Sequence, residues 1–400
     1  MPCAMPTMGY QMRCWVGAQA SIGNYRAIHD CTQIQVTTVD VGPEELREQR
    51  NDADRNLQRY MQTVQQREGR YAITPWSIEQ VLRPSGTAGT APNAAVLYEA
   101  AFGAAANTPG TSEVYSEAEV HCPDGLTIFY GTSKEMWMLG DAIVQTIRIE
   151  HGRDEEVRVT FSGVAALRAR AGAMTIDAVA GMINEPGPST VIMAGFAATY
   201  TPEEGLFQYQ VGTEVIGLTS ITYSTGACVW TRAQAGTSAA AHANGTAVEL
   251  YTPAAAFSGV PIMAYDCSWS VDGGATGLTL LEAWAEYACG IDFLEQEAGE
   301  DRPTRIRRHL IEATWGATFQ GRDDTRQALF SAPANQNALS IAWVMGSAAG
   351  NIAAVAMPVC RARTMTPGFP ADADDLMEFS VEGIAQPTAG NYNAISLTFA

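Results

Sequence analysis

Lysine is almost missing from this sequence, because Lys134 is the only lysine among its 24 Lys and Arg residues. The 43 acidic residues outnumber these cations and give a net charge of −19 at pH 7. An arginine bias of this kind is also what a GC-rich genome produces. Proteins that bind nucleic acids need clustered Lys and Arg to displace counterions from the phosphates. We therefore expect no specific binding of DNA or RNA.

The sequence also lacks the spacings of metal and redox sites. Its eight cysteines, at positions 3, 14, 31, 122, 228, 267, 289 and 360, form no C-x-x-C pair and no Cys/His cluster of zinc spacing. This pattern is typical of small apolar residues in a protein that is kept in a reducing compartment.

Targeting and membrane-spanning segments are not apparent. The first residues lack a basic segment followed by an apolar run, and the least polar stretches, near 191–200 and 348–360, are too short to span a bilayer. We therefore expect a protein without membrane association that is made and kept inside a cell.

Catalytic motifs are missing as well. No phosphate-binding loop, dinucleotide fingerprint, zinc-protease motif or nucleophile elbow occurs, and the five histidines (29, 121, 151, 242 and 309) are scattered singly. The acidic pairs at 323–324 and 374–375 could be calcium ligands or paired carboxylates, but adjacent acids point in different directions, and the first pair suits a helix cap better. We expect no enzyme, and no catalytic, cofactor-binding or metal-binding residues.

What is present predicts a mainly β protein. Apolar residues make up 46% of the chain, which suffices for sizeable cores, and charged residues only 17%. Short segments with alternating polarity are separated by turn residues and predict strands. They lie at Cys31–Val41, Leu126–Tyr130, Ala142–Glu150, Val157–Ser162, Glu214–Tyr223 and Leu376–Val381.

Four segments predict helices instead. Pro43–Arg67 and Leu280–Leu294 place apolar residues at steps of three and four, with Gly290 weakening the second. Two short helices are expected to end at Phe102 and Phe330. The charged segments at about 40–69 and 275–304 are expected to be insertions that project from the body.

Six matches in the same order indicate an internal duplication. They are Asp30-Cys31 with Asp266-Cys267, a 34-residue spacing (Val36–Arg70 with Val271–Arg305), the helix ends at Phe102 and Phe330, Leu126–Ile128 with Leu339–Ile341, Gly140 with Gly350, and residues 154–163 with 374–383. The gaps between matches change in Gly- and Pro-rich loops, where insertions cost little.

The duplication divides the chain into three parts. We expect a first β domain at 1–175, a linker with a small β insertion at 176–255, and a second β domain at 256–400. The copies themselves cover roughly 18–170 and 256–400. The expected core of the insertion contains Phe207, Val211, Val215, Ile216, Ile221, Tyr223, Val229 and Trp230, and most tryptophans are expected in cores or interfaces.

This order of elements resembles the major tail proteins, or tail-tube proteins, of long-tailed bacteriophages and related particles. The resemblance rests on LRPSG at 82–86, PNAAVLYEAAFG at 92–103, LTIFYG at 126–131 and VRVTFSG at 157–163. In the second half it rests on residues 321–333 and 339–358, MEFSVEG at 377–383 and the closing NYNAISLTFA. FQYQVGTEVIGLTSIT at 207–222 is similar to a β insertion of some members.

The resemblance implies two tandem tube-like β-sandwich or half-barrel domains, each with a short helix, and no catalytic residues. It implies rings of this chain that stack into a tail tube, assembled in the bacterial cytoplasm, through which phage DNA passes without specific binding. Its other partners would be the tape measure, tail terminator and distal tail proteins. Because each chain carries two copies of a unit that closes rings of six, a trimeric ring is favoured over a hexameric one.

Other functions stay open at this point. A distal tail or decoration protein shares this composition. A carbohydrate-binding β-sandwich would need exposed aromatic residues and an export signal, and a glycosidase would need two carboxylates across a cleft.

Overall fold

The computed structural model describes residues 12–42, 47–51, 66–119, 123–176, 189–194, 206–222, 227–243, 245–254, 257–272, 274–275, 279–294, 302–321, 338–368, 377–389, 391 and 393–400. In these ranges the chain is mainly β, as predicted. One α-helix, α1 (Ala95–Phe102), and two short 3-10 helices, η2 (Ile28–Asp30) and η3 (Ala264–Asp266), accompany the strands.

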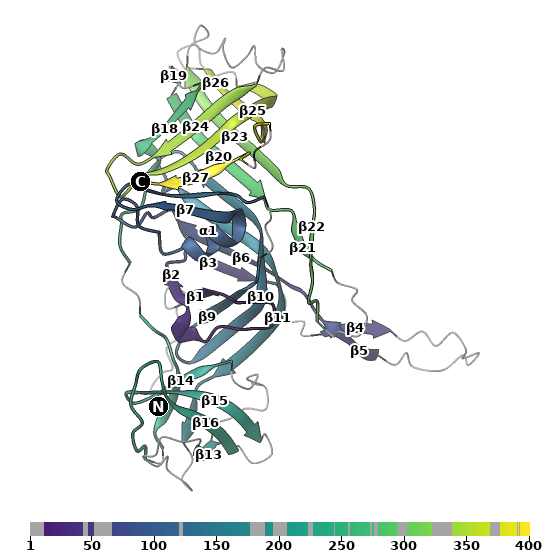
Figure 1. The fold of residues 1–400 in the computed structure, drawn as a ribbon, viewed down its shortest axis with the longest axis vertical. Coiled ribbons are helices and arrows are strands. Elements are labelled where there is room, and N and C mark those ends of the chain that lie inside the picture. Colours follow the sequence, from purple (N-terminus) through teal and green to yellow (C-terminus); the bar gives the residue numbers. More distant parts are fainter. Residues whose placement is uncertain are drawn as a thin grey trace, which may run out of the picture.

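The first β unit is an antiparallel sheet of seven strands. They are β1 (Arg13–Ala18), β2 (Thr32–Ile34), β3 (Thr38–Val41), β6 (Thr74–Val81), β9 (Leu126–Gly131), β10 (Glu135–His151) and β11 (Arg158–Gly172). Their order across the sheet is β2-β1-β9-β10-β11-β6-β3 (Figure 1).

The second β unit has the same order of strands. Its members are β18 (Cys267–Val271), β19 (Gly274–Ala275), β20 (Thr279–Ala288), β23 (Glu312–Gly321), β24 (Leu339–Met345), β25 (Ala353–Gly368) and β26 (Met377–Gln386). They are arranged β19-β18-β24-β25-β26-β23-β20. Each strand therefore occupies the place of the strand with the same rank in the first unit.

Each unit also carries a hairpin at the same point of its topology. In the first, β4 (Arg47–Asn51) and β5 (Gln66–Tyr71) lie between β3 and β6 and stand out sideways from the body (Figure 1). In the second, β21 (Ile291–Phe293) and β22 (Ile306–Arg308) lie between β20 and β23. The hairpin of β7 (Gly103–Thr108) and β8 (Ser112–Glu117) joins the units, because β8 pairs with β27 (Ser396–Phe399), which pairs with β25.

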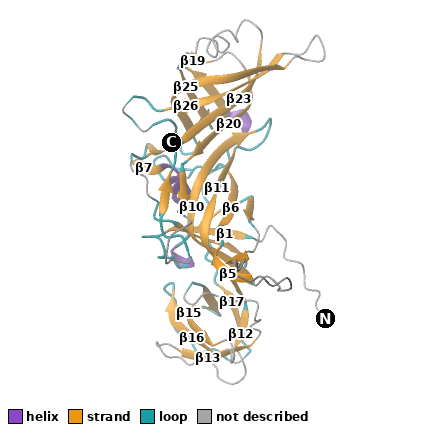
Figure 2. Ribbon diagram, turned by 90° about the vertical axis from the view of Figure 1, so that its right-hand side faces the viewer, coloured by secondary structure: helices purple, strands orange, loops and turns teal. Residues whose placement is uncertain are grey.

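The middle unit is a small closed barrel at one end of the molecule (Figure 2). Its strands are β12 (Met174–Ile176), β13 (Ser189–Ala194), β14 (Gln208–Val211), β15 (Glu214–Thr222), β16 (Ala227–Gln234) and β17 (Ala247–Leu250). Phe207, Val211, Val215, Ile216 and Trp230 of the predicted core are buried, and Val229 is half-buried. The core continues into the first unit through Trp15 and Phe129, and the Trp15 indole donates to the Pro253 carbonyl at 2.8 Å.

A second core runs through both large units. The predicted helix ending at Phe102 is present as α1, closed by Gly103 at φ +84°. Its Tyr98 ring lies 5.2 Å from Phe161 of the first unit and 5.3 Å from Phe399 of the second, and Phe102 stacks on Tyr287 at 5.0 Å. The helix therefore packs where the two units meet.

Both units contain the same local irregularity. The register of β10 against β11 shifts at Gln145, between Val144 and Thr146, and that of β25 against β26 shifts at Arg363, between Ala362 and Thr364. Such a bulge bends a long strand and increases its twist. Gln145 and Arg363 are therefore equivalent positions.

A glycine beside each bulge has the same neighbours in both units. A Cβ on Gly163 would lie 1.9 Å from the Ile143 carbonyl oxygen and 3.0 Å from the Trp76 ring. At Gly383 the corresponding distances are 2.3 Å to the Arg361 carbonyl oxygen and 2.8 Å to the Trp315 ring. Only glycine allows strand and tryptophan to approach so closely.

Two predicted helices are wrong. Residues 47–51 and 66–67 of the first belong to β4 and β5, and the rest of Pro43–Arg67 lies outside the described residues. The second, Leu280–Leu294, forms β20 and β21. In β20 the buried residues are Ala283, Ala285 and Tyr287, which alternate with a period of two, and both edges of the strand are paired. The predicted helix ending at Phe330 lies outside the described residues.

Three of the repeat matches do not join equivalent positions. Gly140 lies within β10, whereas Gly350 lies in the turn before β25. Val36 lies between β2 and β3, whereas Val271 ends β18. The third is the match of Asp30-Cys31 with Asp266-Cys267. Asp30-Cys31 and Asp266-Cys267 each end a 3-10 helix, and each cysteine thiol contacts the carbonyl four residues earlier. However, the strand after Cys31 pairs with β1, whereas the strand after Cys267 pairs with β24. Because β1 pairs with β9 as β18 pairs with β24, the counterpart of β18 is β1.

Candidate assembly interface

The two large units are joined by a strand-to-strand junction. Residues 146–151 of β10 pair with residues 283–288 of β20 in antiparallel register, from Thr146 opposite Ala288 to His151 opposite Ala283. Because β20 is otherwise the outer strand of the second unit, this pairing makes one continuous sheet of the two units.

Charged side chains cross the junction around Arg148. Its guanidinium donates to Glu150 at 2.7 Å and to Glu286 of the second unit at 3.2 Å, and lies 4.8 Å from the centre of the Trp284 ring. Burial acts to lower the pKa of Arg148, but the bonds to these carboxylates outweigh it and raise the pKa above its usual value. The pairs are half-exposed, so they set register more than they stabilise the junction.

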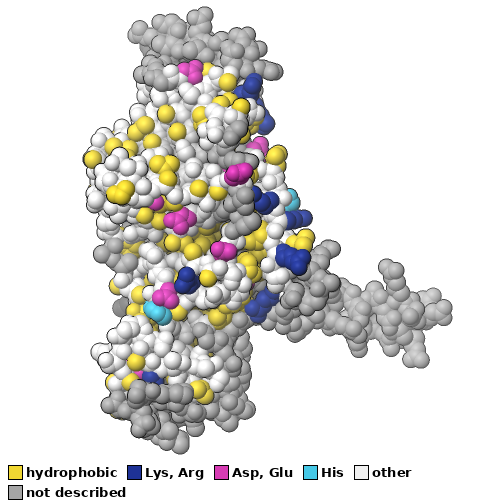
Figure 3. Space-filling view, viewed as in Figure 1, with side chains coloured by type: hydrophobic (Ala, Val, Ile, Leu, Met, Phe, Trp, Pro, Cys, Tyr) yellow, Lys and Arg dark blue, Asp and Glu magenta, His cyan; other side chains and the backbone are white. Residues whose placement is uncertain are grey.

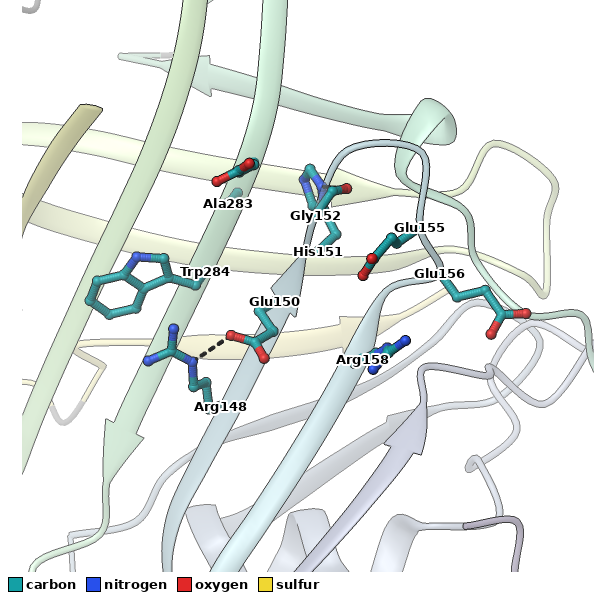
Figure 4. Close-up of a pocket in the computed structure, with 10 residues that line it drawn as sticks. Arg148, Glu150, His151, Gly152, Glu155, Glu156, Arg158, Ala283 and Trp284 are labelled. Atoms are coloured by element: carbon teal, nitrogen blue, oxygen red, sulfur yellow. Dashed lines mark hydrogen bonds and ion pairs between the residues drawn. The ribbon is translucent and has the colours of Figure 1, made fainter. Parts of the chain in front are cut away.

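A pocket of about 340 Å³ opens beside these residues (Figure 4). Four carboxylates line it, from Glu150, Glu155, Glu156 and Glu282, together with Arg148, Arg158 and Trp284. His151 also lines the pocket; it is 5% exposed, and its ring lies 5.5 Å from that of Trp343. Burial lowers the pKa of His151, so the imidazole is neutral at pH 7.

The β21–β22 hairpin reinforces the junction from the second unit. The Cys289 amide donates to the carbonyl of Gln145 at 2.8 Å. The Gln145 side chain donates in turn to the Ile291 carbonyl at 3.3 Å and to the Asp292 carboxylate at 3.2 Å. The bulge residue of β10 is thus held by strand β21 and by Cys289 just before it, on the neighbouring unit.

The outer face of this hairpin is basic. Arg305, Arg307 and Arg308 are exposed, and Lys and Arg side chains gather on the side of the molecule that carries β21 and β22 (Figure 3). Arg307 lies 3.1 Å from Asp292, and Leu310, just beyond β22, is 90% exposed.

Each of the two strands of the junction has a counterpart in the other unit, and the edge of that counterpart is unpaired among the described strands. β3 is the counterpart of β20 and pairs with β6 alone among the described strands. The counterpart of residues 146–151 of β10 is the end of β25, whose residues 364–368 pair with β26 on one side and with no described strand on the other. Thr364 and Thr366 are exposed there, whereas the corresponding part of β10 is covered.

The histidines and acidic pairs do not gather. His29 contacts Gln208 at 2.8 Å, His309 lies 4.0 Å from Asp292, and His121 and both acidic pairs fall outside the described residues. Within the described part of the chain no three His, Cys, Asp or Glu side chains are placed to hold a metal ion. The six cysteines described there are unbridged, and burial raises the pKa of each thiol.

A buried charge cluster in the small barrel was missed by the sequence analysis. Glu214, 0% exposed, accepts hydrogen bonds from Nε and Nη2 of Arg232, at 2.7 and 2.6 Å, and its Oε2 lies 2.8 Å from Nε2 of His242. It also accepts the amides of Ala233 and Ala240. The three side chains are 18 and 10 positions apart in the sequence, so no local motif predicts the cluster.

No protein-family model matches this chain, and no curated protein matches it either. Among the helices of the described residues, none has the length and apolar character needed to traverse a membrane.

Proposed function

We propose that this chain is a structural protein whose copies close into rings, and that the rings stack into the tail tube of a long-tailed bacteriophage or a related particle. DNA would pass through the channel without specific binding. The chain would have no catalytic role, and its location would be the virion tail after assembly in the host cytoplasm.

One observation carries the proposal. The two strands of the β10–β20 junction each have a counterpart in the same molecule, β25 for β10 and β3 for β20, and each counterpart has an edge that no described strand pairs with. The free edge of β3 in one copy can pair with the free edge of β25 in another copy, because their counterparts, β20 and β10, already pair within the chain. A contact between different surfaces of identical molecules is head-to-tail, and it closes a ring when the rotation per copy divides a full turn. Closure also removes sheet edges that would otherwise favour aggregation.

Stoichiometry follows from the common strand order of the two units. Each chain supplies two sheet segments, so a ring of six segments takes three chains, with true threefold and approximate sixfold symmetry. In the alternative arrangement only the first unit contributes to the ring and the second unit decorates its outside. That arrangement gives six chains per ring.

The charge of the chain supports the same function. A net charge of −19 in every copy disfavours a grip on the phosphate backbone, so DNA slides more easily past an acidic or neutral wall. The ends of such a tube would contact tape measure, tail terminator and distal tail proteins.

Electron microscopy of the purified protein tests the proposal. Rings or rods are expected in negative stain, and three chains per ring in a cryo-electron reconstruction. Monodisperse globules over a wide range of concentrations would argue for another virion component, such as a decoration protein. Binding to a glycan panel, or its hydrolysis, would favour the carbohydrate-binding or glycosidase alternatives.

A further inference from the structure

One face of the sheet that spans both large units carries Arg148 and Arg158 beside several glutamates. We infer that Glu79, Glu150 and Glu286 hold these two arginines in ion pairs, so that this face does not bind the phosphates of DNA. The inference rests on the proposed function, since it names the residues that keep DNA from being held in the channel.

Eight strands form this sheet without a break. Their order is β3-β6-β11-β10-β20-β23-β26-β25, and the outer strands β3 and β25 are those with an edge that no described strand pairs with. Three chains with eight strands each would close a barrel of 24 strands, more than the roughly 16–18 strands that already enclose an aqueous channel in porins. A water-filled channel needs a polar wall, so the polarity of the two faces decides which one would line it.

The two faces of the sheet differ in burial and polarity. On each face, residues directly opposite one another form a row across the strands. One row packs in the core and consists of Ile78, Phe161, Ile147, Tyr287, Ala313 and Ala385. The adjacent row, on the other face, is half-buried and consists of Glu79, Thr160, Arg148, Glu286 and Thr314. The second face is therefore the polar one, and it is the face that would line the channel.

Both arginines of the polar face are bound to carboxylates. Arg158 on β11 donates to Glu79 on β6 at 3.3 Å. Arg148 donates to Glu150 on its own strand at 2.7 Å and to Glu286 on β20 at 3.2 Å (Figure 4). Three carboxylates thus face two guanidinium groups, and the cluster carries a net negative charge.

These ion pairs oppose the binding of phosphate. Binding to DNA gains from counterion release only where a cation is free to neutralise a phosphate. A phosphate that approaches Arg148 or Arg158 must first displace a carboxylate, and it is repelled by the carboxylates nearby. The arginines can therefore bridge neighbouring strands of the wall without attracting DNA.

The pairs can be removed without unfolding the protein. The side chains of Arg148 and Arg158 are 38% and 42% exposed, and those of their partners are 28% to 41% exposed. Ion pairs with this exposure contribute little to stability. Replacing each glutamate by glutamine also keeps the size and shape of the side chain.

Removing the carboxylates while keeping the arginines tests the inference. A triple variant combines Glu79→Gln, Glu150→Gln and Glu286→Gln, and a second variant adds Arg148→Gln and Arg158→Gln to it. Assembled particles of each are titrated into a short, fluorescently labelled DNA duplex at several salt concentrations, and anisotropy measures binding.

The triple variant is expected to bind the duplex at least about tenfold more tightly than the wild type at low salt. The slope of log K against log salt should steepen by about 2 or more, since each freed arginine neutralises about one phosphate. The variant that also lacks both arginines is expected to bind as weakly as the wild type.

The matched control is Glu249→Gln, which removes a carboxylate from the exposed pair of Glu249 with Lys134 in the small barrel. It changes the net charge as much as Glu79→Gln does, but only Glu79→Gln is expected to increase DNA binding. Equal binding by these two variants, binding that persists without the arginines, or a triple variant as inert as the wild type would overturn the inference while leaving the ring in place. Absence of rings and tubes from the wild-type protein would overturn the proposed function itself. Circular dichroism and melting temperature show which variants fold, and Glu79→Gln tests the inference even if the triple variant misfolds.

Discussion

Replacing Glu214 by glutamine is expected to loosen the small barrel more than any other single charge removal in it. The side chain of Glu214 is 0% exposed and that of Arg232 is 1% exposed, so the substitution leaves a buried guanidinium without its counter-charge. Removing one partner of such a pair costs about 3–5 kcal/mol. The pKa of Glu214 gives a second measure of how much its interactions contribute to stability. Desolvation acts to raise the pKa of Glu214, but the hydrogen bonds of Arg232, Ala240, His242 and Ala233 lower it from 4.5 to about 2.

A lowering of that size corresponds to about 3 kcal/mol of stability. Because the folded-state pKa lies below the unfolded one, this contribution is complete above about pH 4.5 and is lost as the pH falls towards 2. Hydrogen exchange of peptides from β15 and β16, read by mass spectrometry, measures the free energy of opening. The control is Glu249→Gln, since the Lys134–Glu249 pair is 64% and 40% exposed and should contribute less than about 1 kcal/mol. Equal protection in both variants at pH 7 would refute the reasoning.

Three further outcomes follow from the same structure. Gly383→Ala should lower the free energy of unfolding by about 1–3 kcal/mol in a urea titration, because the added Cβ would lie 2.3 Å from the Arg361 carbonyl oxygen. Gly217→Ala is the control and should be nearly neutral, because its Cβ would lie 3.8 Å from the Gln234 side chain. Deleting residues 44–67 should leave a folded chain that no longer polymerises, and normal rods from that variant would contradict a role of the projecting first hairpin in assembly. The lumen in a cryo-electron reconstruction should be acidic or neutral, so a bore dominated by arginines would contradict the expected passage of DNA.

Strands and the first helix could be predicted where local pattern and packing agree. Residues 126–130 and 142–150 were expected as strands and lie in β9 and β10, and α1 ends at the expected Phe102. The error at 280–294 has a physical cause. Two of the three buried residues of β20, Ala283 and Ala285, are small, so they add little to an apolar pattern. The larger Leu280 and Trp284, which are only half-buried, fall by chance at helical spacing with Tyr287.

The candidate interface could not be predicted from the sequence at all. The junction pairs residues about 137 positions apart in the chain, from Thr146 with Ala288 onwards, and no local pattern encodes that register. The bulges at Gln145 and Arg363 are equally invisible, because a bulge depends on the count of residues in two partner strands. The sequence comparison detected only the glycines beside the bulges, Gly163 and Gly383, which are the final residues of the matched segments 154–163 and 374–383.

The covalent link between the two large units changes the kinetics of any assembly built from them. The β10–β20 contact forms during folding of a single chain, so its partners meet at an effective concentration set by tether length rather than by the amount of protein made. In a ring of three such chains, half of the junctions would already exist before the first encounter between molecules. Nucleation would then require only the remaining contacts, and fewer incomplete arcs with exposed strand edges would accumulate at low expression.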